Sequence, residues 1–278
     1  MMWISGMNKP DHHTINRFRS ERLKKVLEEI FTQIVELLIE AGQLKAGYNL
    51  QISSSNQYIV NYSLHQKPTD TTTLSVHIES YKEKYGTVPE VIVADAGYGS
   101  EENYEYLENQ KIEGYVKYNY FDKEQKKSKK DKKPFAAEKL YYNKEEDSYY
   151  CPMGQQMKKI GERERRSENR YSKTISIYQA INCKGNPVRG VCHNQKGNRI
   201  ISVSHRGNYL RKKAKEKLET EEGIKYRKKR PVEAEPVFGN IKQNKKFKRF
   251  YLRGLHKVKT ELGLIAIAHN LAKLAIAT

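Results

Sequence analysis

The residues best suited to carry chemistry include one acidic side chain at the end of an apolar run. Asp95 follows Val91–Ala94 and precedes Ala-Gly-Tyr-Gly. Such a run is typical of a buried parallel strand, and open α/β sheets place functional groups at the carboxyl ends of their strands. An aspartate that only hydrogen-bonds the glycine-rich turn after it fits the same residues. This segment alone does not separate the two interpretations.

A second candidate is Glu235, which lies in the segment 230–242. Gly239 and Lys242 follow it at i+4 and i+7, which is one face of an α-helix. A carboxylate, a residue without a side chain and a lysine would suit a metal-bridged phosphate that approaches the backbone closely. A solvated helix face with one glycine for helix packing explains the same pattern and, for this segment alone, is the simpler interpretation.

Sulfur and imidazole ligands form a third candidate set, namely Cys151, Cys183, Cys192 and His193. Thiolates and imidazoles can hold zinc in a tetrahedral site. The sequence contains no complete C-x-x-C pair, and isolated buried or free thiols are therefore the interpretation that the spacing favours.

The composition narrows the class of protein. The chain has 278 residues, a formal net charge of +19, 37% hydrophobic residues and three cysteines. No apolar run approaches the ~18 residues of a membrane span, and the N-terminus lacks the shape of a signal peptide. The odd cysteine number predicts a reducing, cytoplasmic location. The charge favours a polyanionic partner, above all nucleic acid, although a merely soluble basic protein would share it.

The pattern of apolar residues predicts an α/β fold. A basic amphipathic helix is expected over 14–40, and two strands over 48–52 and 58–64 with a turn at 53–56. A helix with Leu74, His77, Ile78 and Tyr81 on its apolar stripe should follow Pro68–Asp70. Strand 90–95, helix 100–110 and strand 114–118 then form a βαβ unit.

The second half of the chain differs in composition. Seven lysines between 121 and 134 predict a solvated loop, and short β segments with all three cysteines extend to 202. Helix is expected again from 205, with a break at Pro231 and a new helix from 232. An apolar helix over 256–276 ends the chain.

Several motifs together resemble the bacterial insertion-sequence transposases of the DDE type. Asp-Ala-Gly-Tyr-Gly-Ser at 95–100 is similar to their second acidic motif, and Glu235-x6-Lys242 to their third. Further similarity covers segments 10–19, 47–51, 65–72 and 247–254, with Lys257, Glu261 and 269–271. The resemblance extends in order over nearly the whole chain.

The resemblance implies an RNase H-like domain, a mixed sheet with flanking helices that binds transposon ends and target DNA. Three carboxylates there hold two Mg²⁺ or Mn²⁺ ions for cleavage and strand transfer. Asp95 matches the second carboxylate and Glu235 the third. Lys242 is expected to contact DNA phosphate, and the basic segments around Glu235 add Arg230, Lys248, Arg249 and Arg253. The family also implies a homo-oligomer, which we expect at the nucleoid.

The first carboxylate of the family has no counterpart. Residues 41–46 are too few for a strand and its turn, and they contain no Asp or Glu. Glu40 sits at a helix end, and Asp70 is interpreted as a helix cap. We therefore expect a shortened copy that lacks the first strand of its sheet and its catalytic activity. The competing hypotheses are an active transposase, a noncatalytic DNA-binding remnant or regulator, and a basic RNA-binding protein that would explain only the charge.

The expected organisation has four parts. These are an N-terminal helical segment (1–41), the first part of the RNase H-like core (42–120), a lysine- and cysteine-bearing insertion (121–202) and the last part of the core with the glutamate helix (203–278).

Overall fold

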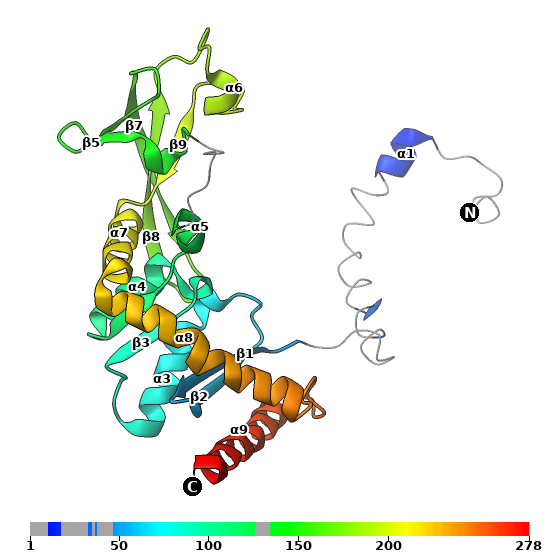
Figure 1. The fold of residues 1–278 in the computed structure, drawn as a ribbon. Helices are drawn as coiled ribbons and strands as arrows, with labels where there is room; N and C mark the ends of the chain where they lie inside the picture. Colours follow the sequence, from blue (N-terminus) through cyan, green and yellow to red (C-terminus); the bar gives the residue numbers. More distant parts are fainter. Residues whose placement is uncertain (1–10, 18–32, 35–36, 38–46, 126–133, 278) are drawn as a thin grey trace. The chain divides into compact units, whose positions relative to one another are not determined.

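The computed structural model describes residues 11–17, 33–34, 37, 47–125 and 134–277. The chain divides into two units, residues 1–48 and 49–278 (Figure 1). The first unit contains helix α1 (His12–Arg17), at whose start Asp11 Oδ1 accepts the N–H of Thr14 at 2.7 Å. This helix confirms the beginning of the one predicted over 14–40, of which residues 33–34 and 37 are also helical. The other positions of that prediction lie outside the described residues.

The second unit begins with the predicted hairpin. Strands β1 (Asn49–Ser55) and β2 (Tyr58–His65) pair antiparallel. The turn falls at Asn56 and Gln57, later than predicted, and both have positive φ, at 50° and 65°. Positive φ at both central positions is what a two-residue hairpin turn requires. The predicted strands are therefore confirmed, and the serines expected in the turn extend β1 instead.

The βαβ unit is also present. Strands β3 (Val91–Ala94) and β4 (Glu113–Val116) pair in parallel, with helix α4 (Glu101–Asn109) between them. The hydroxyl of Ser100 begins α4 by accepting the N–H of Asn103. Two short 3-10 turns, η2 (Asp70–Thr72) and η3 (Ala96–Tyr98), precede helix α3 (Leu74–Tyr85) and α4. These elements confirm the α/β class.

Helices α3 and α4 cover one face of the β3–β4 pair, where Leu74, Ile78, Leu107 and Val116 form one apolar cluster. The β1–β2 hairpin and the β3–β4 pair are separate two-stranded sheets. Among the described residues, no strand pairs with both of them.

The segment between the βαβ unit and the last helices contains a sheet of its own. Its five antiparallel strands follow chain order: β5 (Tyr141–Asn143), β6 (Ser148–Tyr150), β7 (Gln156–Arg166), β8 (Ser172–Ala180) and β9 (Ile200–Val203). A separate core fills one face, with Met157 and Tyr178 completely buried. Three short helices accompany it: α5 (Phe121–Gln125), η4 (Ala137–Lys139) and α6 (Arg189–Cys192). Helix α5 occupies the start of the predicted loop, and residues 126–133 lie outside the described part.

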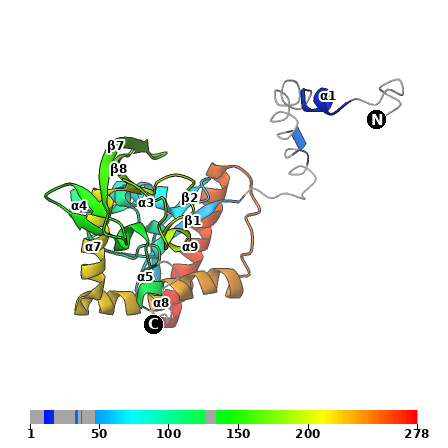
Figure 2. The ribbon, with the colours of Figure 1, turned by 90° about the horizontal axis from the view of Figure 1, so that it is seen from above.

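The last part of the chain is helical, as predicted. Helix α7 (His205–Glu219) leads through Thr220 into α8 (Glu221–Gly239), whose end widens into the π-helical turn η5 (Asn240–Asn244). Helix α9 (Leu255–Ala277) follows and packs against β2 (Figure 2). No helix in the described part of the chain is both long and apolar enough to cross a membrane.

The break predicted at Pro231 is wrong. Helix α8 continues through Pro231 and Pro236, although each proline removes one backbone donor. Tertiary packing on both sides explains this. Tyr226 packs against Tyr115 of β4, with 4.6 Å between the ring centres. Val237 is fully buried and packs with Ile59 of β2. These contacts hold the helix on the core, so the loss of two hydrogen bonds does not end it.

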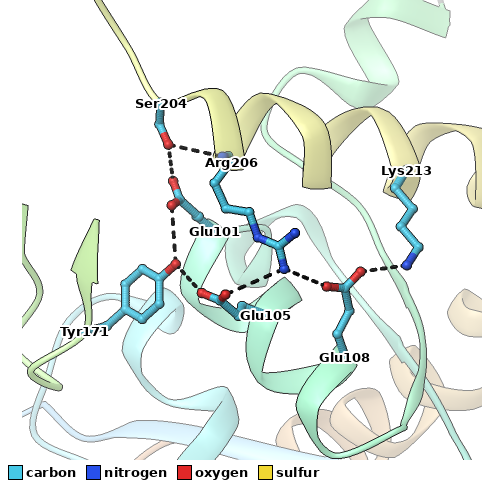
Figure 3. Close-up of polar contacts among 8 residues, drawn as sticks. Glu101, Glu105, Glu108, Tyr171, Ser204, Arg206 and Lys213 are labelled. Atoms are coloured by element: carbon cyan, nitrogen blue, oxygen red, sulfur yellow. Dashed lines mark hydrogen bonds and ion pairs between the residues drawn. The ribbon is translucent and has the colours of Figure 1, made fainter. Parts of the chain in front are cut away.

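The five-stranded sheet is fixed to the βαβ unit by a dense polar network around α4 (Figure 3). Glu101 accepts the Ser204 hydroxyl at 2.6 Å, and Tyr171 of the β7–β8 loop donates to Glu105 at 2.5 Å. Glu108 pairs with Arg206 at 3.0 Å and with Lys213 at 2.7 Å. These contacts tie α4 to α7 and to the tip of the β7–β8 hairpin.

A second cluster lies where the sheet meets the first residue of α7. The Tyr178 hydroxyl lies 2.5 Å from Asp147 Oδ1 and 2.6 Å from His205 Nε2, and Lys159 pairs with Asp147 at 2.9 Å. The Tyr178 hydrogen bond and the Lys159 ammonium lower the pKa of Asp147 to about 2. We call this cluster and the network around α4 the joint.

Candidate functional site

Asp95 lies where the sequence places it, at the carboxyl end of β3. It precedes the turn η3, and its side chain is 51% exposed. The turn passes close to the end of β4, because a Cβ on Gly99 would lie 2.3 Å from the carbonyl oxygen of Lys117. Only glycine fits there, so the Gly-Tyr-Gly sequence is what lets the chain leave β3 tightly beside β4.

A carboxylate that the sequence analysis interpreted differently lies against the same turn. Asp70 does not cap a helix with its side chain, which instead accepts hydrogen bonds from Asn49 at 2.8 Å and Gln51 at 3.0 Å. A Cβ on Gly97 would lie 3.0 Å from Asp70 Oδ2, so this glycine permits the approach. The sequence offers one signal for this arrangement, the polar residue Gln51 in an otherwise ordinary strand. The structure shows that this residue is buried.

Arg230 of α8 completes this part of the site. Its Nη2 lies 3.4 Å from Asp95 Oδ2. Burial, followed by the charges of Asp70 and Asp95, raises the pKa of Tyr98, while the charge of Arg230 lowers it. The two carboxylates and the guanidinium therefore all act on one partly buried phenol. We call Asp70, Asp95, Tyr98 and Arg230 the carboxylate edge.

Glu235 lies farther along α8. Its side chain is exposed, and no hydrogen bond or ion pair joins it to another described residue. The neighbouring Glu233 is different, since it accepts the backbone N–H of Gln57 at 2.8 Å and pairs with Lys229 at 3.5 Å. Glu233 thus holds the β1–β2 turn against α8. Of these two glutamates, Glu235 is the one without a partner.

The face predicted for Glu235, Gly239 and Lys242 is changed by the π-helical turn. Because η5 begins at Asn240, its wider turn rotates Lys242 away from the ideal i+7 position. Lys242 is exposed and lies 5.8 Å from the centre of the Phe238 ring. The side chains of Lys248, Arg249 and Arg253 are exposed in the segment after η5.

The aromatic residues of that segment have separate environments. Phe247 packs on the cluster of Ile59, Val237 and Ile241 and contacts Phe250 edge to face at 5.1 Å. Phe247 therefore packs into the core. Tyr251 is 74% exposed, and its N–H is held by the carboxylate of Glu261.

The carboxylates do not make the two-metal site that the resemblance implies. Within residues 11–17, 33–34, 37, 47–125 and 134–277, no group of three or more His, Cys, Asp or Glu side chains could hold a metal ion. Asp95 faces a guanidinium, Asp70 is held by two amides, and Glu235 is joined to neither. The residues present therefore do not fit a pair of Mg²⁺ or Mn²⁺ ions.

The predicted zinc ligands are likewise not gathered into a site. Cys151 and Cys183 are buried in the core of the five-stranded sheet. Cys192 accepts a hydrogen bond from Arg199 at 3.0 Å, and the backbone N–H of Arg199 lies 3.4 Å from the sulfur of Cys183. The N–H of Gln195 reaches His193 at 3.2 Å. Cys151 and Cys183 are buried and Cys192 is partly buried. Among the described residues, no three of these four candidate ligands could hold zinc together.

A comparison with protein families finds a match in the second part of the chain. Residues 150–275 match the family of the transposase DDE domain. This range contains Glu235, Lys242 and the cysteines and ends in α9, whereas Asp95 lies before it. No curated protein and no solved structure matches the chain. The match covers the motif around Glu235, and residues 150–275 are therefore similar to the DDE domain of transposases.

Proposed function

We propose that this chain binds DNA as a member of the DDE-type transposases but does not carry out metal-dependent cleavage and strand transfer. The observation that carries the proposal is the state of the carboxylate edge. Asp95 is paired with Arg230, and no described group of three ligands includes it. A two-metal displacement needs several oxygen ligands around both ions.

The arrangement of the sheets supports the loss of the first strand. The β1–β2 hairpin and the β3–β4 pair are not hydrogen-bonded to each other. A strand that carried the first carboxylate would pair between them, as the family resemblance implies. We propose that a deletion before Gly47 removed this strand, with its carboxylate.

The proposed DNA surface follows α8 and the segment after it. Lys242, Lys248, Arg249 and Arg253 are exposed there and pair with no carboxylate in the described residues. Cations that neutralise phosphates release condensed counterions, so this surface can bind DNA without any metal. Arg230 would join it only after leaving Asp95. Transposon ends are the proposed substrate, and a homo-oligomer is the proposed assembly.

The proposed organisation keeps the boundaries 1–41, 42–120, 121–202 and 203–278. The five-stranded sheet is the body of the insertion at 121–202, and α7, α8 and α9 return the chain to the core. The joint then serves to hold the insertion at a fixed place beside α4.

DNA affinity as a function of salt tests the binding part. The full chain should bind duplexes of the transposon ends with an association constant whose logarithm falls linearly with log salt, at about 0.9 per phosphate contact. The double variant Lys248→Gln/Arg249→Gln should lose roughly two phosphate contacts, and its slope should be shallower by the corresponding amount. The control Lys82→Gln, at an exposed lysine of α3, should not change it. Equal slopes for all three proteins would contradict the proposed surface.

Strand transfer tests the catalytic part. With matching ends and Mg²⁺ or Mn²⁺, we expect no joined product from the full chain. The competing function is an active transposase, which the family match favours. If the wild type joins DNA ends and Asp95→Asn does not, the protein is an active transposase and our proposal is overturned.

A further inference from the structure

The carboxylate edge contains its own cation. Arg230 lies over the end of β3, where its guanidinium is 3.4 Å from Asp95 Oδ2. Its side chain is 27% exposed, compared with 51% for Asp95. A guanidinium stays charged at every physiological pH. Asp95 therefore has a permanent counter-charge from within the chain.

Packing on both sides of Arg230 keeps it there. One turn earlier on α8, Tyr226 stacks on Tyr115 of β4 at 4.6 Å. Almost one turn later, Glu233 accepts the N–H of Gln57 at the β1–β2 turn. These positions share a face of the helix, so α8 is anchored to β4 and to the hairpin. The residue between the two anchors must face the end of β3.

The charge balance of the edge also favours a cation. Asp70 is fixed close to the turn after Asp95 by Asn49 and Gln51, and Gly97 allows the approach. Two carboxylates near the partly buried Tyr98 repel each other, and a positive charge beside them offsets that repulsion. Arg230 supplies that charge, and it does so at the carboxylate that matches a metal ligand of the family.

We propose that Arg230 replaces the divalent cation at Asp95 and closes the carboxylate edge to metal ions. The guanidinium and a divalent ion would compete for the same carboxylate oxygen atoms, and their like charges would repel. This inference concerns the site of the proposed function but does not require DNA binding. It explains why the residues present do not fit the metal pair of the family.

Thermal unfolding during a Mn²⁺ titration tests the proposal on the full chain without DNA. The wild type should show little Mn²⁺-dependent shift in Tm. Arg230→Gln should gain one, with a half-maximal Mn²⁺ concentration lower by about fivefold or more, as expected when an exposed ion pair no longer competes. Lys228→Gln is the matched control, because it removes a neighbouring exposed charge of the same helix. It should behave as the wild type.

Two further variants test where the ion binds and whether the charge of Arg230 excludes it. Arg230→Gln/Asp95→Asn should lose the gained response, whereas Arg230→Lys should keep metal out because it retains the charge. If Arg230→Gln does not fold, the test still has two folded variants to compare with the wild type, Arg230→Lys and Asp95→Asn. A wild type that responds to Mn²⁺ as strongly as Arg230→Gln would overturn the proposal, as would a gain that survives Asp95→Asn. DNA affinity, measured separately, reports on the proposed function alone.

Discussion

The joint and the carboxylate edge both depend on acidic side chains, yet the carboxylates of the joint are more fully engaged than Asp95 of the edge. In the joint, Glu101, Glu105, Glu108 and Asp147 each have a hydroxyl or a cation as partner, and most have two or more. At the edge, Asp95 has one ion pair of 3.4 Å and is half exposed, while Asp70 accepts two amide hydrogen bonds. Glu235, which lies on α8 outside the edge, has no described partner.

This difference separates two uses of a carboxylate. A side chain with all its oxygens satisfied contributes to stability and cannot exchange its partners cheaply. One with a single exposed ion pair contributes little to stability. We infer that the joint holds the insertion in place. At the edge, the packing of α8 on both sides of Arg230, rather than the strength of the ion pair, keeps the guanidinium at Asp95.

Removal of the buried ring at the centre of the joint should have the largest effect. Tyr178 is completely buried and bonded to Asp147 and His205. We expect Tyr178→Ala to lower the free energy of unfolding by about 3–5 kcal/mol, measured by urea denaturation. Tyr178→Phe keeps the ring and should cost only about 1–2 kcal/mol. Equal losses for both variants would show that packing contributes nothing to the joint.

The stability of the protein near the edge should depend more on space for the backbone than on the polar side chains. A Cβ at Gly99 would meet the Lys117 carbonyl at 2.3 Å and Tyr118 Cα at 2.6 Å. Gly99→Ala should therefore cost about 1–3 kcal/mol. The control is Gly161→Ala in β7, where a Cβ meets nothing within 4 Å. If both variants unfold at the same urea concentration, the close approach of β3 and β4 at Gly99 is not needed.

Acid should loosen the joint in a defined range of pH. The pKa of Asp147 is lowered to about 2 by the Tyr178 hydrogen bond and by Lys159. Its unfolded pKa is near 3.9, so the folded state binds fewer protons. This contribution is fully present above about pH 4 and is lost as pH falls through about 2. Between those values Asp147→Asn should show a shallower decline of stability than the wild type. Parallel declines would mean that other carboxylates carry the acid response.

Substitution of Asp95 at the edge and of Glu235 on α8 should have the smallest effect on stability. Asp95→Asn removes one half-exposed ion pair and should change the free energy of unfolding by less than about 1 kcal/mol. Glu235→Gln should change it by less than about 0.5 kcal/mol, because the exposed side chain has no described partner. Urea denaturation of both variants beside Glu108→Gln would check the comparison directly. A loss at Asp95 larger than that at Glu108 would reverse it.

Much of the fold could be predicted from local patterns. The alternation of residues around Ile52 and Ile59 predicted the hairpin, and the apolar run before Asp95 predicted β3. The spacing of Leu74, His77 and Ile78 predicted α3, in which all three are buried. Each of these signals lies within a few residues of the chain. Two predictions failed because distant contacts overrode local preference: the break at Pro231 and the interpretation of Asp70 as a cap.

The sequence by itself determined that the chain is a basic α/β protein with ordered acidic motifs of the DDE transposases, because residue types and spacing are local properties. Tertiary structure alone decided which carboxylates are engaged. It assigned Glu233 to the β1–β2 turn, Asp70 to Asn49 and Gln51, and Arg230 to Asp95. These partners are separated by tens to more than a hundred residues and are chosen by packing, because only the folded core brings α8 across the ends of β3 and β4.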